Sequence, residues 1–169
     1  MCIRDRPGVG IVGAKLYYPD DTIQHAGVIV GLGGYAGHSH KYAKRGGSGY
    51  MFRAATVQDL SAVTAACLLV KAAVYDEAGG LDEGFAVAFN DVDFCLRVRA
   101  LGYRVLFTPY AELYHYESKS RGLDTKGPAR ERFEGERRRM KQRYGERLLR
   151  DPFYNPNLTL DREDFSESD

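Results

Sequence analysis

The fold is decided by residues 89–97, FNDVDFCLR, and by the residues that follow them. Apolar side chains recur there at i, i+4 and i+7, which is the spacing of one helical face. These side chains are Phe94, Val98 and Leu101. The pattern predicts a helix over residues 91–101, and Gly102 directly afterwards is a typical helix end. The helix therefore begins with two carboxylates close together.

These carboxylates, Asp91 and Asp93, point roughly 200 degrees apart on a helix and cannot do the same work. Asp93 precedes Arg97 by four residues, the spacing of an intrahelical ion pair, so its default role is structural. Asp91 fits two compatible roles. It can cap the helix by accepting a backbone N–H, and it can act as a general base at the rim of a cleft. His115 follows 24 residues after Asp91, within folding reach of it.

Strand-like and helical segments alternate on both sides of this helix. The expected strands are 9–16, 60–71, 103–107 and 111–116, with Pro109 separating the last two, and a further short apolar segment is 23–30. The expected helices are 72–78 and a last helix with an apolar stripe of Phe133, Met140, Tyr144 and Leu148. The alternation predicts an α/β fold with a mixed sheet flanked by helices. Ligands bind such sheets at the carboxyl ends of the strands, where the loops gather.

Residues 31–49 contain seven glycines and are expected to form a long mobile loop. Within it, His38-Ser39-His40 is expected to be solvated polar sequence, because no third metal ligand lies nearby in the sequence. The glycines at 46–49 lack the Lys-Ser/Thr ending of a phosphate-binding loop. This segment is therefore not predicted to hold a metal or a phosphate.

The composition excludes several classes of protein. The 169 residues suffice for one domain at most, and a formal net charge of +1 gives no overall attraction to nucleic acid or membrane. The cysteines are odd in number, and Cys67 and Cys95 lie in apolar runs, which argues against a disulfide framework. No apolar run approaches the roughly 18 residues of a membrane span. We expect a cytoplasmic location, with peripheral association at the inner membrane left open.

The chain divides into four expected parts. Residues 1–6 resemble translated adapter sequence and are expected to be non-native. Residues 7–126 carry the alternating strands and helices, residues 127–150 are expected to form a basic amphipathic helix, and residues 151–169 form an acidic, turn-rich tail.

Several motifs occur in order along the chain. They are VTAACLLVK at 63–71, GGLDE at 79–83, NDVDFCLR at 90–97, GYRV at 102–105, TP at 108–109, YH at 114–115, SRG at 120–122 and YNPNL at 154–158. Together they resemble family 2 glycosyltransferases, most closely the bacterial rhamnosyltransferase-like and O-antigen-type members. The resemblance implies a GT-A fold and inverting transfer of a sugar from a nucleotide-sugar donor to a hydroxyl of a glycan or lipid-linked acceptor, in bacterial surface polysaccharide or glycan synthesis. It also implies that residues 31–49 lie near the acceptor, where a gating role for them stays open.

The resemblance also implies roles for individual residues. Asp91 matches the aspartate that deprotonates the acceptor, although Asn90 stands where the family more often has Glu. Thr64, Asn90 and Asp93 are expected to contact substrate. Arg121 either reaches the donor phosphates in a bidentate fashion or is an exposed loop arginine.

A divalent metal, Mn²⁺ or Mg²⁺, is the cofactor that the resemblance implies. His115 matches a histidine that completes the metal coordination in some members, and imidazole suits Mn²⁺. The main ligands belong to a nucleotide-binding half with an Asp-x-Asp-like motif, which this sequence lacks. The chain is therefore expected to be the acceptor-side part of a GT-A catalytic domain, inactive in isolation.

Two alternatives remain open at this point. Residues 130–150 hold nine Lys or Arg against four Glu, which fits a non-catalytic module that binds an anionic partner. The interspersed glutamates favour a solvated amphipathic helix instead, and no nucleic-acid partner is expected. The second alternative is a purely structural α/β domain in which Asp91 only caps its helix.

Overall fold

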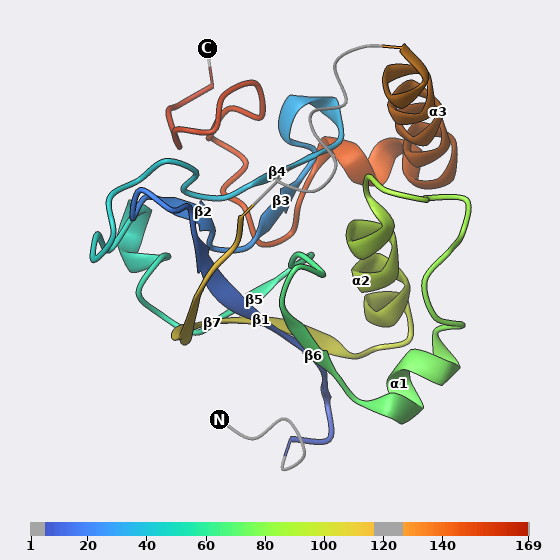
Figure 1. Cartoon of the computed structure of the whole chain (residues 1–169), viewed down its shortest axis with the longest axis horizontal. Coiled ribbons are helices and arrows are strands. Elements are labelled where there is room, and N and C mark those ends of the chain that lie inside the picture. The colour runs from blue at the N-terminus through green and yellow to red at the C-terminus, as the bar shows by residue number, and fades with distance from the viewer. Residues whose placement is uncertain (1–5, 117–126, 169) are drawn as a thin grey trace.

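The computed structural model describes residues 6–116 and 127–168, and Figure 1 shows a mixed β-sheet with α-helices gathered on one side. Its strands are β1 (Val9–Tyr17), β2 (Ile23–His25), β3 (Val28–Val30), β4 (Ala36–His38), β5 (Gln58–Leu60), β6 (Leu68–Val70) and β7 (Arg104–Tyr114). Its helices are α1 (Ala72–Glu77), α2 (Asn90–Ala100) and α3 (Gly127–Tyr144), with short 3-10 helices η2 (Leu32–Gly34), η3 (Tyr50–Phe52) and η4 (Gly145–Leu149). The predicted α/β fold with a mixed sheet is confirmed. Its identification as part of a GT-A fold stays a prediction.

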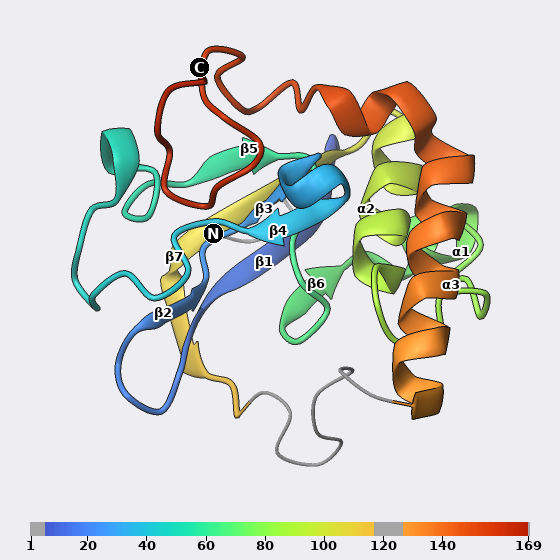
Figure 2. The same ribbon diagram turned by 90° about the horizontal axis from the view of Figure 1, so that it is seen from above.

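Strand β1 is the centre of the larger sheet. It pairs in parallel with β7 along one edge and antiparallel with β2 and β6 along the other, and β5 pairs antiparallel with the far edge of β7. A strand covered on both faces needs a nearly continuous apolar run, and every residue of β1 except Val12 is buried. The helices cover one side of this sheet, and Figure 2 shows α2 and α3 running side by side there.

Strand β7 runs through Pro109, so the prediction of two separate strands there was wrong. Its register with β1 jumps from Gly13 opposite Phe107 to Lys15 opposite Glu112, which is five residues along β7 against two along β1. Proline has no N–H to give to a ladder, and an irregularity of this kind is where a strand accommodates it.

The prediction of one central strand over residues 60–71 was also wrong. Strand β5 ends at Leu60 and β6 begins at Leu68. Because β5 pairs with β7 while β6 pairs with β1, the connecting residues must cross the sheet. Among them, Ala62 and Val63 are fully buried, which explains the apolar run that resembles a strand.

Residues 31–49 are more ordered than the predicted mobile loop. They contain η2 and strand β4, and β4 pairs antiparallel with β3. The glycines supply the tight turn between these strands, since Gly31 and Gly34 adopt φ values of 98° and 81°. Ser39 and His40 are buried, so the expectation of solvated polar sequence at His38-Ser39-His40 was wrong.

The remaining elements pack on the sheet as amphipathic pieces. Helix α2 buries Val92, Phe94, Cys95 and Val98, and α3 buries Met140 and Tyr144. Burial raises the pKa of the Cys95 thiol to about 12, so this cysteine behaves as a small apolar residue.

Downstream of α3, Tyr154 and Leu158 pack with Ile29 and Leu32 of the β3–β4 region. None of the helices in the described parts of the chain has the length and apolar character of a membrane span.

Candidate active site

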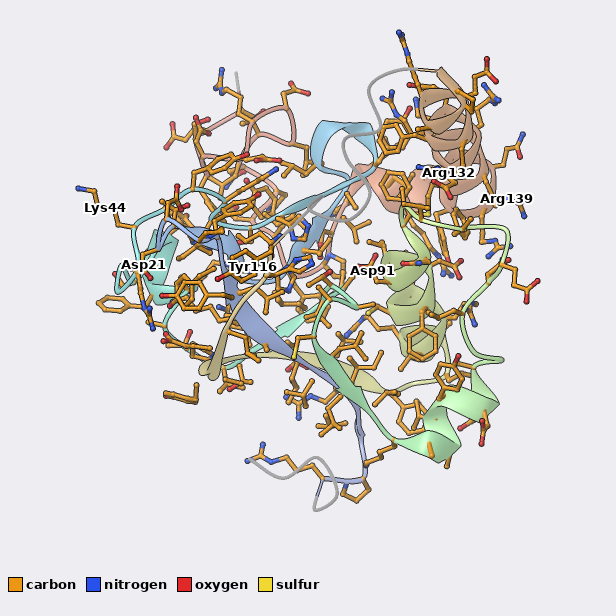
Figure 3. The ribbon with its side chains drawn as sticks, in the orientation of Figure 1. Asp21, Lys44, Asp91, Tyr116, Arg132 and Arg139 are labelled. Carbon is orange, nitrogen blue, oxygen red and sulfur yellow. The ribbon has the colours of Figure 1, made fainter. Side chains whose placement is uncertain are left out.

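Asp91 lies in the first turn of α2, two residues after the cap position. The cap residue is Phe89, with φ 64°, so the prediction that Asp91 occupies the cap was wrong by two positions. The Asp91 carboxylate still accepts two backbone N–H groups: Oδ1 takes that of Val92 at 2.9 Å and Oδ2 takes that of Ala65 at 3.1 Å. Figure 3 shows Asp91 at the amino end of α2. The partly exposed carboxylate is therefore fixed in orientation and favoured by the helix dipole.

The segment that leads into α2 is held from α3. Glu136 is buried, and its carboxylate accepts the N–H groups of Val87 and Ala88 at 2.9 and 3.1 Å. The Phe89 ring packs against those of Tyr35 and Phe133, with ring centroids 6.0 and 5.9 Å away. These contacts hold Phe89 in a left-handed conformation that is uncommon for a bulky residue. Helix α3 thus sets where α2 begins, and with it the position of Asp91.

Asp93 is fully buried and does not reach a surface on which substrate could bind. Its Oδ2 accepts from Nε of Arg97 at 2.8 Å, which confirms the predicted intrahelical pair. Its Oδ1 accepts from Arg143 at 2.6 Å and from the Tyr144 hydroxyl at 2.7 Å. Both oxygens are used inside the protein, so the expected substrate contact of Asp93 does not fit this structure and its role is structural.

Two other residues expected to bind substrate, Asn90 and Thr64, belong to the described parts of the chain. Asn90 is the partly buried first residue of α2, and Thr64 directly precedes Ala65, so the structure brings both close to Asp91. The Thr64 side chain is nearly buried, and its hydroxyl oxygen accepts the Ala66 N–H at 3.3 Å. Arg121 lies outside the described residues.

His115 follows the end of β7, where its backbone N–H donates to the Tyr17 carbonyl oxygen at 2.9 Å. Its Nδ1 lies 2.9 and 3.0 Å from the amide nitrogen and oxygen of Gln24. The Gln24 side chain comes from β2 and is buried, and it occupies Nδ1 of His115. Within residues 6–116 and 127–168, Nε2 of His115 has no hydrogen-bond partner, so it is the ring nitrogen that could bind a ligand.

The only predicted metal ligand in the described residues is His115, through its Nε2 atom. Among residues 6–116 and 127–168, no group of three or more His, Cys, Asp or Glu side chains could hold a metal ion. His115 alone is an incomplete site, since divalent metals in catalytic sites take several protein ligands. Binding of Mn²⁺ or Mg²⁺ therefore stays a prediction that depends on further ligands.

Sequence reasoning missed His25, which is completely buried in β2. Its Nδ1 lies 2.8 Å from Nδ1 of His38, and its Nε2 accepts the Thr64 N–H at 3.4 Å. Burial, followed by the nearby His38 and His115 rings, lowers the pKa of His25 well below its ordinary value, so the ring is neutral at physiological pH. The signal was present in the sequence as two polar residues, Gln24-His25, inside an apolar segment.

The basic side chains of α3 are partly committed to the protein itself. Arg143 pairs with Asp82 and Asp93, both at 2.6 Å. The Arg137 guanidinium lies 4.2 Å from the centre of the Tyr35 ring, and Arg139 lies 5.9 Å from that of Phe85. This inward use of charge weakens the alternative of a module that binds an anionic partner through this helix.

Comparison with known proteins found relatives in several bacteria. The chain is 53% identical over 98% of its length to an uncharacterized protein of Sinorhizobium fredii, y4gI. It is 39% identical over 92% of its length to the O-antigen biosynthesis protein RfbC of Myxococcus xanthus. It is 32% identical over 37% of its length to an N-acetylglucosaminyl-diphospho-decaprenol L-rhamnosyltransferase of Mycobacterium tuberculosis.

The chain spans only part of these relatives: 18% of the Sinorhizobium protein, 12% of RfbC and 20% of the rhamnosyltransferase. No family model matches the chain. No solved structure matches it either. Similar sequence thus occurs within proteins named for O-antigen biosynthesis and rhamnosyl transfer.

Proposed function

We propose that the chain is the acceptor-side part of an inverting family 2 glycosyltransferase with a GT-A fold. It acts in bacterial surface polysaccharide or glycan synthesis. The observation that carries the proposal is the Asp91 carboxylate, oriented by the N–H groups of Ala65 and Val92 at the amino end of α2. The names of the relatives support the same class of reaction.

The reaction needs one proton acceptor at this position. An acceptor hydroxyl oxygen attacks the anomeric carbon of the donor sugar, the bond from that carbon to the diphosphate breaks, and its electron pair leaves with the nucleoside diphosphate. The hydroxyl proton passes to Asp91. A positioned carboxylate acting as general base typically contributes about 10²–10⁴-fold to such a step. The two fixed N–H bonds keep the carboxylate in place for that transfer.

The neighbouring residues complete the proposed acceptor side. Asn90, next to Asp91 in α2, and Thr64, next to Ala65, are proposed to contact the acceptor. Arg121 is proposed to bind donor phosphate, and His115 to supply one ligand to Mn²⁺ or Mg²⁺. Such a metal would neutralise charge on the departing diphosphate. Its other ligands are proposed to come from sequence outside this chain, so we expect the isolated chain to show no transfer. The protein is proposed to work in the cytoplasm, with peripheral association at the inner membrane left open.

The test replaces Asp91 by Asn in the intact protein that contains this chain. Asn keeps an oxygen that accepts the Ala65 N–H but cannot take the proton. With a nucleoside-diphosphate-L-rhamnose donor and a prenyl-diphosphate-linked N-acetylglucosamine acceptor, we expect nucleoside diphosphate release to fall by about 10²–10⁴-fold with an unchanged melting temperature.

The matched control for that test is Asp76→Asn, a change to an exposed carboxylate in α1. It should leave release unchanged. Wild-type rates in the Asp91→Asn variant would show that Asp91 is not the base.

A further inference from the structure

Two consecutive N–H groups connect the interior of the protein to Asp91. The N–H of Thr64 points to Nε2 of His25, and the N–H of the next residue, Ala65, points to Oδ2 of Asp91. Thr64 and Ala65 lie in the segment that crosses the sheet between β5 and β6. The buried His25 ring and the partly exposed Asp91 carboxylate therefore each accept a hydrogen bond from the same short piece of backbone.

The hydrogen bonds of His25 fix its protonation. An N–H can only donate, so Nε2, which receives the Thr64 N–H, carries the lone pair. The single proton of the neutral ring must then lie on Nδ1, from which it donates to Nδ1 of His38 at 2.8 Å. The low pKa of His25 agrees with a neutral ring. In this state His25 links β4, through His38, to the crossing segment.

We propose that His25, as its Nδ1–H tautomer, is a positioning residue for Asp91 that acts through the Thr64–Ala65 backbone. The inference rests on the proposed function, because it assigns His25 to the geometry of the proposed base. His25 is fully buried and touches no substrate. Its effect is to keep the Ala65 N–H aimed at the carboxylate while the acceptor binds and the proton is transferred.

The first experiment tests the tautomer without any activity assay. Long-range ¹H–¹⁵N correlation spectra of the wild-type chain distinguish a protonated ring nitrogen from one with a lone pair. We expect Nε2 of His25 to carry the lone pair. The Ala65 amide resonance should shift in both His25→Leu and Asp91→Asn. A protonated Nε2, or an Ala65 amide that ignores the His25 substitution, overturns the proposal.

The second experiment measures transfer by the intact protein. His25→Leu keeps apolar volume but removes the acceptor for Thr64, and we expect kcat to fall by roughly 10–100-fold with the KM for the donor unchanged. His25→Gln places a carbonyl oxygen near the position of Nε2 and should restore most of the rate. His25→Asn is too short to reach Thr64 and should resemble His25→Leu, so it serves if the leucine variant does not fold.

His40 provides the matched control. It is buried, and its Nε2 also accepts a backbone N–H, that of Tyr50 in η3 at 3.0 Å, but no hydrogen bond links η3 to Asp91 in the described parts of the chain. His40→Leu should lose comparable stability and keep kcat. Equal losses of kcat in the His25 and His40 variants would mean a merely structural role for His25. An active Asp91→Asn variant would instead refute the proposed base, while the spectra would still decide the link between His25 and Ala65.

Discussion

Nη1 of Arg143, near the end of α3, lies 2.6 Å from Oδ1 of Asp93, which is buried in α2. The Tyr144 hydroxyl donates to the same oxygen at 2.7 Å, and Nε of Arg97 donates to the other carboxylate oxygen, Oδ2. Arg97 also donates to the Gly80 carbonyl oxygen at 2.7 Å, which connects α2 to the turn after α1. One carboxylate therefore joins three separate segments of the chain.

The first prediction concerns this carboxylate. Asp93→Ala leaves two guanidinium groups without their common anion, and removing one partner of a buried ion pair typically costs about 3–5 kcal/mol. We expect a loss of that size in the free energy of unfolding, measured by urea denaturation. Asp76→Ala, on the exposed face of α1, should change it by less than about 0.5 kcal/mol. Similar losses in both variants would contradict the role assigned to Asp93.

The second prediction concerns the pH dependence of stability. Burial, and then the positive charges of Arg53 and Lys15, lower the pKa of His40 to about 4 from its ordinary value of 6.5. Below pH 6.5 the unfolded chain therefore takes up a proton that the folded protein does not, so stability falls as the pH drops from 6.5 to about 4. Above pH 6.5 this group has no effect.

The full size of the His40 effect is roughly 3 kcal/mol, since each pKa unit corresponds to about 1.4 kcal/mol. We expect His40→Gln to lose less stability than the wild type between pH 6.5 and 4, as followed by urea denaturation at several pH values. Other groups titrate in the same range, and the difference between the two proteins isolates His40. Parallel curves would show that His40 is not buried as a neutral ring.

The third prediction concerns the contact between β1 and the crossing segment. A Cβ built on Gly13 would lie 2.5 Å from the Cβ of Val63, which is fully buried. Because this distance is too short for two carbon atoms, the strand or the crossing segment must shift, and Gly13→Ala should destabilise the protein by about 1–3 kcal/mol or more. A Cβ on Gly8 meets nothing within 4 Å, so Gly8→Ala should be nearly neutral. Equal melting temperatures would contradict this packing.

Local patterns in the sequence predicted the elements that depend on local chemistry. The apolar spacing around Phe94 located α2 to within one residue at each end, and the apolar run from Val9 located β1. The crossing of residues 61–67 could not be predicted, because it depends on which strands β5 and β6 pair with. The passage of β7 through Pro109 likewise depends on a register jump against β1, which has no local signature.

The candidate site shows the same division. The ion pair between Asp93 and Arg97 follows from their spacing, whereas Arg143 and Tyr144 reach Asp93 only because α3 packs on α2. The bond from Ala65 to Asp91 likewise joins segments 26 residues apart. The position of Asp91 and the family resemblance therefore made it a candidate base, but its supporting contacts appear only in the folded chain.

The last prediction concerns His115 as a metal ligand. Gln24 occupies Nδ1 of His115, so Nε2 is the ring nitrogen that could bind the metal. Nε2 has a lone pair for the metal only if the proton of the neutral ring lies on Nδ1, from which it donates to the Gln24 oxygen. In the intact protein, His115→Ala should weaken Mn²⁺ binding, measured by electron paramagnetic resonance, by at least about tenfold. Gln24→Leu should weaken it by roughly 10–100-fold, because hydrogen-bond partners of ligating histidines fix the ring and its tautomer.

His40→Ala is the control for both variants, since the His40 ring forms hydrogen bonds with Ser39 and Tyr50 instead. Unaltered Mn²⁺ affinity in His115→Ala would exclude ligation, and weakening in that variant but not in Gln24→Leu would show that the tautomer is set without Gln24.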